Sequence, residues 1–258
     1  VLLRIATLDG VQPVALRDIK AIGKRYEAKV NDVLVAAMTG ALRTYLKGRG
    51  VDVAHTTVRA MVPVDLRPPE RIGQLGNEFG LVLLDLAVTE VRADRRLALT
   101  KARMDALKRS PEPLATKALL NLLGRGPKLL EDISNDLFGR KASVVMTNVV
   151  GPADALYLAG VPIDRILPWA PHPGKQLGMA VSILSYRGTA SLTVIGDALL
   201  VPDPETITAE FNREFKKLLK GVKAVAATTT GKKAPAKKAP AKKAAAKKTQ
   251  ATRRPAAR

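Results

Sequence analysis

The sequence predicts an α/β protein in which helices cover a mixed sheet as a sandwich, followed by a basic C-terminal segment. Three observations predict this fold class. β-branched runs alternate with amphipathic segments, hydrophobic residues reach 47% although aromatics are only 3%, and positive charge gathers at one end. A chain of 258 residues can bury a large core. Because aromatics are few, Val, Leu, Ile and Ala must fill that core.

Two helices are predicted near the start of the chain. Apolar residues at helical spacing predict the first over residues 16–26. The second begins at Asn31, its predicted N-cap, and Asp32 lies where the positive first turn favours an acid. Either Gly48 or Gly50 is expected to end it.

Two strands and a third helix follow. Alternating apolar residues predict a strand over residues 58–68, in which Pro63 indicates an edge or a bulge. A second strand is predicted over residues 75–88. Apolar residues in steps of three and four predict an amphipathic helix over residues 91–110.

The next segments are two shorter helices and a strand that ends abruptly. The helices are predicted over residues 115–123 and 127–137, the second with a proline in its first turn. The strand covers residues 141–150 and stops in the turn formed by Gly151 and Pro152.

The last part of the folded region predicts further strands and a final helix. An interrupted strand pair and two longer strands are expected over residues 154–171, 176–186 and 189–199. Arg187 and Gly188 join the longer two as a hairpin. Asp203 is the predicted cap of the final helix, with Pro204 in its first position.

Charge divides the chain into two parts. The chain holds 43 Lys and Arg against 23 Asp and Glu, a net charge of +20. Residues 221–258 contain 12 of these cations and no acid, so residues 1–220 keep 31 cations for 23 acids, or only +8. A segment with so few large apolar side chains is predicted to be disordered. We therefore expect one folded domain, residues 1–220, and a disordered polybasic tail, residues 221–258.

Lysine pairs in the tail are candidate polyanion-binding residues. The pairs are Lys232, Lys233, Lys237, Lys238, Lys242, Lys243, Lys247 and Lys248. The composition of the tail resembles the Lys-Ala-Pro tails of linker histones. Its charge predicts binding to nucleic acid or to an anionic membrane. A tail that only solvates the protein is an open alternative, because no aromatic side chain is interleaved to stack on bases.

Several kinds of chemistry lack their residues in this sequence. Cys is absent, which excludes disulfides and thiolate metal sites and fits a reducing cytoplasm. His55 and His172 have no His or Cys at metal spacing, so we expect no metal and interpret both as ordinary loop or surface residues. The sequence shows no phosphate-binding glycine loop, nucleophile elbow or membrane-spanning run. We therefore expect no cofactor and a cytoplasmic protein.

Four stretches of sequence carry a family resemblance. They are KVNDVLVAAMTGALRTYL, VRAMVPVDLRPPE with LGNEFGLVLLDL, SVVMTNVVGPADALYLAGVPI, and GMAVSILSYRGTASLTVIGDALLVPDPETI. In this order, with the Asn-Asp pair and the Asn-Val-x-Gly-Pro turn, nearly all of residues 1–220 resembles the C-terminal half of bacterial wax ester synthase/diacylglycerol acyltransferases. The resemblance implies one lobe of a chloramphenicol acetyltransferase-like fold, whose two lobes enclose a tunnel entered by acyl-CoA and the acceptor alcohol from opposite sides.

The chemistry implied by this resemblance is acyl transfer to a hydroxyl group. The substrates would be acyl-CoA and either diacylglycerol or a long-chain alcohol, and the products triacylglycerol or wax ester. The family's His-His-x-x-x-Asp-Gly motif supplies the general base. This chain contains no His-His pair. Since the family carries that motif in its N-terminal half, the resemblance implies a missing N-terminal lobe and a chain that is inactive alone.

The resemblance also implies which residues line the tunnel. They are Asn31, Asp32, Thr147, Asn148, Gly151 and Pro152. From the residues alone, the first two form a helix cap and the others a turn that ends a strand, and the cap is compatible with a place in the tunnel wall.

Three further residues are weaker candidates. Asn77 lies in the motif LGNEFG. Trp169 either lines an acyl groove or belongs to the core or an interface. Arg67 could meet a phosphate of CoA or an acid within the fold.

Two other functions stay open. The protein could be a non-enzymatic polyanion-binding module that acts through its tail, or a degenerate remnant or half of a split enzyme. If it is half of a two-lobed enzyme, the surface that faces the other lobe should be apolar. Alternatively, the tail would hold a complete enzyme at the inner face of an anionic membrane or at lipid droplets.

Overall fold

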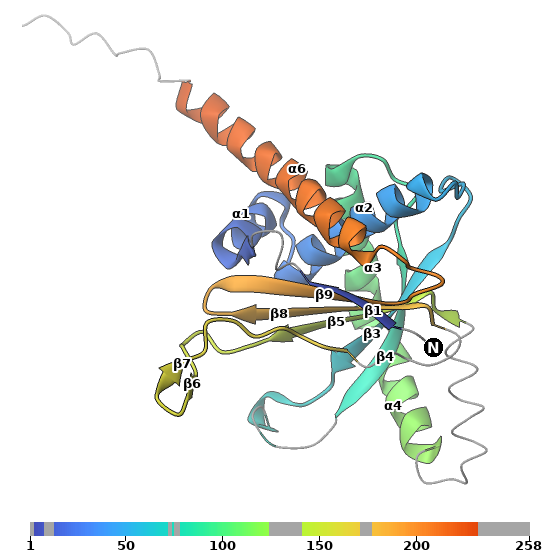
Figure 1. Ribbon diagram of the computed structural model, residues 1–258. Coiled ribbons are helices and arrows are strands. Elements are labelled where there is room, and N and C mark those ends of the chain that lie inside the picture. The colour runs from blue at the N-terminus through green and yellow to red at the C-terminus, as the bar shows by residue number, and fades with distance from the viewer. Residues whose placement is uncertain are drawn as a thin grey trace, which may run out of the picture.

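A mixed sheet with helices packed on it forms the centre of the protein (Figure 1). The computed structural model describes residues 3–7, 13–71, 74, 78–123, 141–170 and 177–231. The seven strands of the main sheet are β1 (Leu3–Thr7), β2 (Val14–Ala15), β3 (Val58–Asp65), β4 (Phe79–Leu86), β5 (Val144–Val150), β8 (Met179–Tyr186) and β9 (Thr189–Asp197). Their order is β1-β9-β8-β5-β3-β4, with β2 also on β9, and β5 runs parallel to both β3 and β8. The mixed α/β fold is therefore confirmed.

Helices bury one face of this sheet, and one further helix lies at its β4 edge. They are α1 (Leu16–Tyr26), α2 (Val30–Gly48), α3 (Ala93–Arg109), α4 (Glu112–Leu123) and α6 (Pro204–Gly231), with a short 3-10 helix at Pro69–Arg71. In Figure 1, α1, α2 and α6 lie together above the strands. Helix α2 is buried over most of its length, and its Leu34 and Met38 join Phe211 of α6 in the core. Aliphatic residues supply nearly all of that core, as the composition predicts.

The position of the α2 N-terminus differs from the prediction. Lys29, not Asn31, is the N-cap, with extended backbone angles of φ −81° and ψ 164°. Asp32 therefore lies three residues after the cap, where its carboxylate accepts the Lys29 backbone N–H at 2.8 Å. Asn31 falls inside the first turn, which frees its side chain for a contact elsewhere. The prediction that an acid lies in the first turn is confirmed.

Strand β3 is an interior strand, yet Pro63 is tolerated in it. Its hydrogen-bonded register with β5 covers only Ala60 and Met61, whereas its pairing with β4 runs along all of β3. Pro63, which has no N–H to donate, lies beyond the part that β5 reaches. The proline therefore stands where β3 has a single strand neighbour, opposite Leu81.

Helix α4 closes the free edge of β4. The Thr116 hydroxyl accepts the Leu81 N–H at 2.9 Å, and the Glu112 carboxylate accepts the Leu83 N–H at 2.9 Å. Gly80 permits this approach, because a Cβ there would overlap the Pro113 carbonyl oxygen. Side chains thus occupy positions at which another strand would pair.

Two hairpins agree with the turn chemistry of the sequence. Arg187 and Gly188, both with positive φ (47° and 77°), connect β8 to β9 as predicted. The interrupted strand pair is a small separate hairpin, β6 (Tyr157–Leu158) and β7 (Val161–Pro162), which projects from the sheet in Figure 1. Strands β1 and β2 were not predicted from the sequence, and the predicted helix over 127–137 lies outside the described residues.

Helix α6 continues to Gly231, so residues 221–231 are helical where disorder is predicted. Val222 packs against the core, and the first proline of the segment is Pro235. Nothing therefore interrupts the helix at residue 221, the boundary that charge alone suggested. The lysine pairs from Lys232 onward lie outside the described residues.

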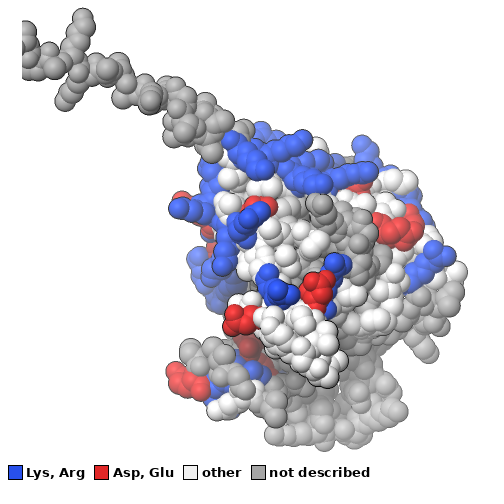
Figure 2. All heavy atoms as spheres, turned by 60° about the vertical axis from the view of Figure 1, so that its left-hand side comes forward, with Lys and Arg blue, Asp and Glu red and all other residues white. Residues whose placement is uncertain are grey.

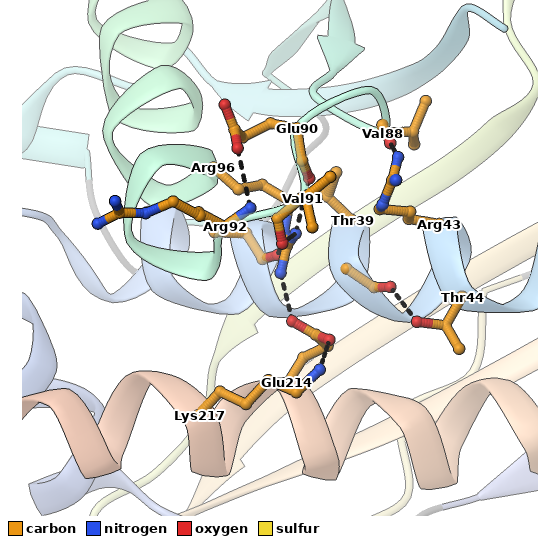
Figure 3. Close-up of polar contacts among 12 residues, drawn as sticks. Thr39, Arg43, Thr44, Val88, Glu90, Val91, Arg92, Arg96, Glu214 and Lys217 are labelled. Atoms are coloured by element: carbon orange, nitrogen blue, oxygen red, sulfur yellow. Dashed lines mark hydrogen bonds and ion pairs between the residues drawn. The ribbon is translucent and has the colours of Figure 1, made fainter. Parts of the chain in front are cut away.

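A buried ion pair joins three helices (Figure 3). Arg96 of α3 is 1% exposed and contacts Glu214 of α6, and its guanidinium also donates to the carbonyl oxygens of Ala36 on α2 at 3.2 Å and Glu90 at 2.9 Å. Gly40 of α2 makes room, since a Cβ there would lie 2.5 Å from the Arg96 guanidinium. Burial lowers the pKa of Arg96, and the charge of Glu214 opposes that shift.

We expect Tyr45→Phe to destabilise the protein by about 1 to 2 kcal/mol at pH 8. The Tyr45 hydroxyl donates to Asp203 at 2.8 Å and ties α2 to the start of α6. Burial, followed by this hydrogen bond, raises the pKa of Tyr45 to about 12. The hydrogen bond contributes fully below the ordinary tyrosine pKa near 10 and is lost as pH rises through about 12.

Urea unfolding at pH 8 and between pH 10 and 12 measures both effects. The wild type should lose more stability than Tyr45→Phe over the alkaline interval. Tyr157→Phe is the matched control, because Tyr157 is 66% exposed and its substitution should leave unfolding unchanged. Equal alkaline losses in all three proteins would contradict the assigned role of Tyr45.

Candidate functional site

The candidate site lies where β3 and β5 separate. The two strands are paired at Ala60–Val144 and Met61–Val145, after which β5 follows β8 as far as Val150. Beyond Val145, the ends of β3 and β5 are not paired with each other. The side chains of Pro63, Thr147 and Asn148 therefore border an opening at the ends of two parallel strands.

A hydrogen bond between two motif residues bridges this opening. Asn148 Nδ2 donates to Asn31 Oδ1, joining the end of β5 to the first turn of α2. These residues are 117 positions apart in the chain. The Asn-Asp and Asn-Val-x-Gly-Pro motifs, which the sequence could only place separately, thus meet in one site. Asp32 supports the turn that carries Asn31, and its other oxygen, Oδ1, is buried without a hydrogen-bond partner among the described residues.

Two hollows lie on either side of the Asn31–Asn148 pair. The larger has a volume of about 240 Å³ and the smaller about 30 Å³, and both are lined by Asn31, Leu34 and Asn148. The remaining lining is mostly aliphatic, with Lys20 at the larger hollow and Thr147 at the smaller. Such a surface can accommodate a hydrocarbon chain next to a pair of amide groups.

The turn after β5 is held against the β8–β9 hairpin. The Gly151 N–H donates to the Ser185 carbonyl at 3.0 Å, and the Pro152 carbonyl accepts the Arg187 N–H at 3.2 Å. A Cβ on Gly151 would overlap the Ser185 carbonyl oxygen, so only glycine fits. The Thr147 hydroxyl lies 3.1 Å from that of Ser182 on β8. These contacts fix the position of Asn148.

Other candidates lie away from this site or outside the described residues. His55 is exposed, and its Nδ1 lies within hydrogen-bond distance of Asp52 Oδ2, at 2.7 Å, which confirms that it is a surface residue. Trp169 is 62% exposed, which excludes the core, whereas its predicted places at an interface or in an acyl groove stay predictions. The Arg67 N–H donates to Asp65, a contact that does not test binding to CoA. Asn77 and His172 are not among the described residues.

The structure adds residues that sequence reasoning missed. Leu34, Lys20, Val150 and Ala190 line the larger hollow with the motif residues. Leu34 follows Asn31 by three positions and so shares its helix face, which is the one signal that could have identified it. Within the described parts of the chain, no cluster of His, Asp and Glu could hold a metal ion. Nor is any helix in those parts long and apolar enough to cross a bilayer.

Two acyltransferases are among the solved structures with a similar fold. A wax ester synthase/diacylglycerol acyltransferase from Marinobacter aquaeolei matches with a TM-score of 0.65 and 23% identity, over 86% of this chain and 49% of that protein. The PapA2 acyl transferase matches with a TM-score of 0.51 and 11% identity, over 84% of this chain and 44% of that one. The fold is therefore one lobe of an acyltransferase-type architecture.

Sequence comparison then assigns the family. The model of the WS/DGAT C-terminal domain matches residues 75–219, more than half of the chain. The chain belongs to the wax ester synthase/diacylglycerol acyltransferase family and contains its C-terminal domain. A Mycobacterium tuberculosis protein named as the probable diacylglycerol O-acyltransferase tgs2 is 29% identical over 215 residues, 82% of this chain and 47% of the relative. The similarly named tgs1 is 26% identical over 194 residues, 74% and 42% respectively. The chain thus spans about half the length of these relatives.

Proposed function

We propose that this chain is the C-terminal lobe of an acyl-CoA-dependent O-acyltransferase and forms one wall of its substrate tunnel. The observation that carries the proposal is the Asn31–Asn148 hydrogen bond, which places both family motifs between two largely apolar hollows. The acceptor would be diacylglycerol or a long-chain alcohol, as the names of the relatives suggest.

The proposed reaction divides its chemistry between two lobes. The acceptor oxygen bonds to the thioester carbonyl carbon as a general base takes the hydroxyl proton. The carbon–sulfur bond then breaks, and the base returns this proton to the sulfur, so that CoA leaves as the thiol. The base would come from the His-His-x-x-x-Asp-Gly motif of an N-terminal lobe. The C-terminal lobe, formed by this chain, would orient the acyl chain along the aliphatic lining of its hollows. The Asn31 and Asn148 side-chain amides keep further donor and acceptor capacity for a substrate.

Exposed apolar residues support a second lobe next to the site. Val150, the last residue of β5, is 86% exposed, and Leu158 and Val161 of the projecting β6–β7 hairpin are 73% and 66% exposed. Large side chains grouped in this way are typical of a surface that another domain covers. We infer that the N-terminal lobe packs against this hairpin and against Trp169.

Reconstitution tests the proposed function. The chain is co-produced with the N-terminal half of a relative that carries His-His-x-x-x-Asp-Gly, and ester formation from radiolabelled acyl-CoA and diacylglycerol or hexadecanol is measured. We expect ester only when both halves are present, and none when the second His of the motif is replaced with Ala. A stable complex of both halves that forms no ester, beside an active full-length relative, would overturn the proposal.

The polybasic tail suggests a second role, which needs no catalysis. We infer that the lysine pairs between Lys232 and Lys248 bind a polyanion, since residues 221–258 contain 12 cations and no acid. In an acyltransferase, this binding would place the protein at an anionic membrane or a lipid droplet, where its lipid acceptors lie. In a non-enzymatic module, the partner would be nucleic acid, and the vesicle and duplex measurements described below separate these cases.

A further inference from the structure

The folded part of the protein has a basic surface of its own. Lys and Arg side chains gather along the upper and left part of the face in Figure 2, with few acids among them. Five exposed lysines belong to two neighbouring helices, α1 and α6. We define the α1–α6 basic surface by Lys20 and Lys24 of α1 with Lys216, Lys220 and Lys223 of α6.

Helix geometry places these lysines in two stripes. Lys216, Lys220 and Lys223 are spaced four and three apart on α6, opposite the buried Phe211, Phe215 and Leu218. The two helices are packed together at this point, since a Cβ on Gly221 would lie 2.7 Å from the Tyr26 hydroxyl. The two stripes therefore lie on adjacent helices.

The charges of this surface are not neutralised within the fold. None of the five lysines forms an ion pair with a described residue, whereas Arg213 and Lys217 on the same helix pair with Glu210 and Glu214. Unpaired cations in such a group create a positive potential that attracts phosphate groups. Charge here is available for a partner rather than used for stability.

We propose that the α1–α6 basic surface docks the protein on an anionic lipid bilayer. Lys20 belongs both to this surface and to the lining of the 240 Å³ hollow, whose other residues are mostly aliphatic. A row of cations beside an apolar hollow matches a lipid, which carries a phosphate group on a hydrocarbon chain. Nucleic acid fits less well, because Tyr26, the aromatic residue of α1, is half-buried and has the Arg25 guanidinium 5.4 Å from its ring centroid.

Docking in this way would let a lipid pass from the bilayer towards the Asn31–Asn148 pair. This passage of lipid rests on the proposed function. Vesicle binding does not rest on it, because binding can be measured without any enzymatic activity. Each lysine near an anionic surface strengthens binding by a factor of about five. Removing three should therefore weaken partitioning on the order of 100-fold.

Sedimentation with lipid vesicles tests the proposal on the full chain. The variant Lys216→Gln/Lys220→Gln/Lys223→Gln is compared with the wild type on phosphatidylglycerol/phosphatidylcholine vesicles and on phosphatidylcholine alone, at 0.05 and 0.2 M salt. We expect the wild type to bind only the anionic vesicles, more weakly at high salt, and the variant to bind them at least tenfold less.

A matched control removes the same charge from another helix. Arg95→Gln/Lys108→Gln/Arg109→Gln alters three exposed cations of α3 and should bind vesicles like the wild type. Because all six side chains are exposed, circular dichroism should show unchanged folding in both triple variants. Equal binding by the α6 variant and the wild type would overturn the proposal and assign membrane binding to the tail. A loss confined to binding of a 20-base-pair DNA duplex would overturn it in favour of nucleic acid.

Discussion

Replacing Arg96 with alanine should lower the free energy of unfolding by about 3 to 5 kcal/mol. The guanidinium is 1% exposed and connects α3 to Glu214 of α6 and to the backbone of α2 (Figure 3). Its removal leaves the Glu214 carboxylate buried with only Lys217, at 2.5 Å, to compensate its charge. Helices α2, α3 and α6 would then lose their shared contact. Chemical unfolding followed by circular dichroism measures the loss.

A double variant distinguishes an unpaired charge from lost packing. In Arg96→Met/Glu214→Met, both charges are gone and comparable volume remains, so most of the stability should return. Arg95→Ala is the control, since Arg95 is the exposed neighbour on the same helix and should cost less than about 0.5 kcal/mol. If the double variant is less stable than Arg96→Ala, the buried charge is not what destabilises the single variant.

Gly151→Ala should reduce ester synthesis by the reconstituted enzyme about 100-fold. A methyl group at this position overlaps the Ser185 carbonyl oxygen, which also accepts the Gly151 N–H. Relief of the overlap must shift the end of β5, and Asn148 lies three residues before the glycine. A displacement of about 1 Å of a positioning group is enough for such a loss. The rate constant kcat, measured at saturating acyl-CoA, is the quantity to compare.

Gly48→Ala provides the matched glycine control. Gly48 is the last residue of α2, and nothing lies within 4 Å of a Cβ built on it. Ester synthesis should therefore be unchanged in this variant. Thermal unfolding of Gly151→Ala would show whether the folded lobe survives. A folded Gly151→Ala lobe with full activity would show that the turn does not position the site.

Local patterns predicted most of the elements, and long-range pairing explains what they missed. Helices α1, α2 and α3 and strands β3, β5, β8 and β9 follow from periodicity and turn residues within the segments themselves. Strand β1 forms through its partner β9, which is almost 200 residues away in sequence and cannot be anticipated from the residues Leu3–Thr7. The N-cap was misplaced by two residues because the side chain of Asn31 is used by a distant partner.

The candidate site was predictable as residues but not as an arrangement. Asn31, Asp32, Asn148 and Gly151 were all selected from sequence, two of them as a cap and two as parts of a turn. Their proximity depends on β5 lying between β3 and β8, which no spacing within either motif encodes. The exposure of Trp169 shows the same limit, because burial depends on which elements cover a segment.

The closed edge of β4 also determines how the protein can associate. Polymerisation by strand addition requires two complementary free edges on every molecule, one to give and one to receive. In this protein, the side chains of Thr116 and Glu112 accept hydrogen bonds from backbone N–H groups of β4, so the β4 edge is not free. The exposed apolar hairpin β6–β7 can therefore pack against a partner lobe. Open-ended fibres through β4 are prevented, because another strand cannot pair with its closed edge.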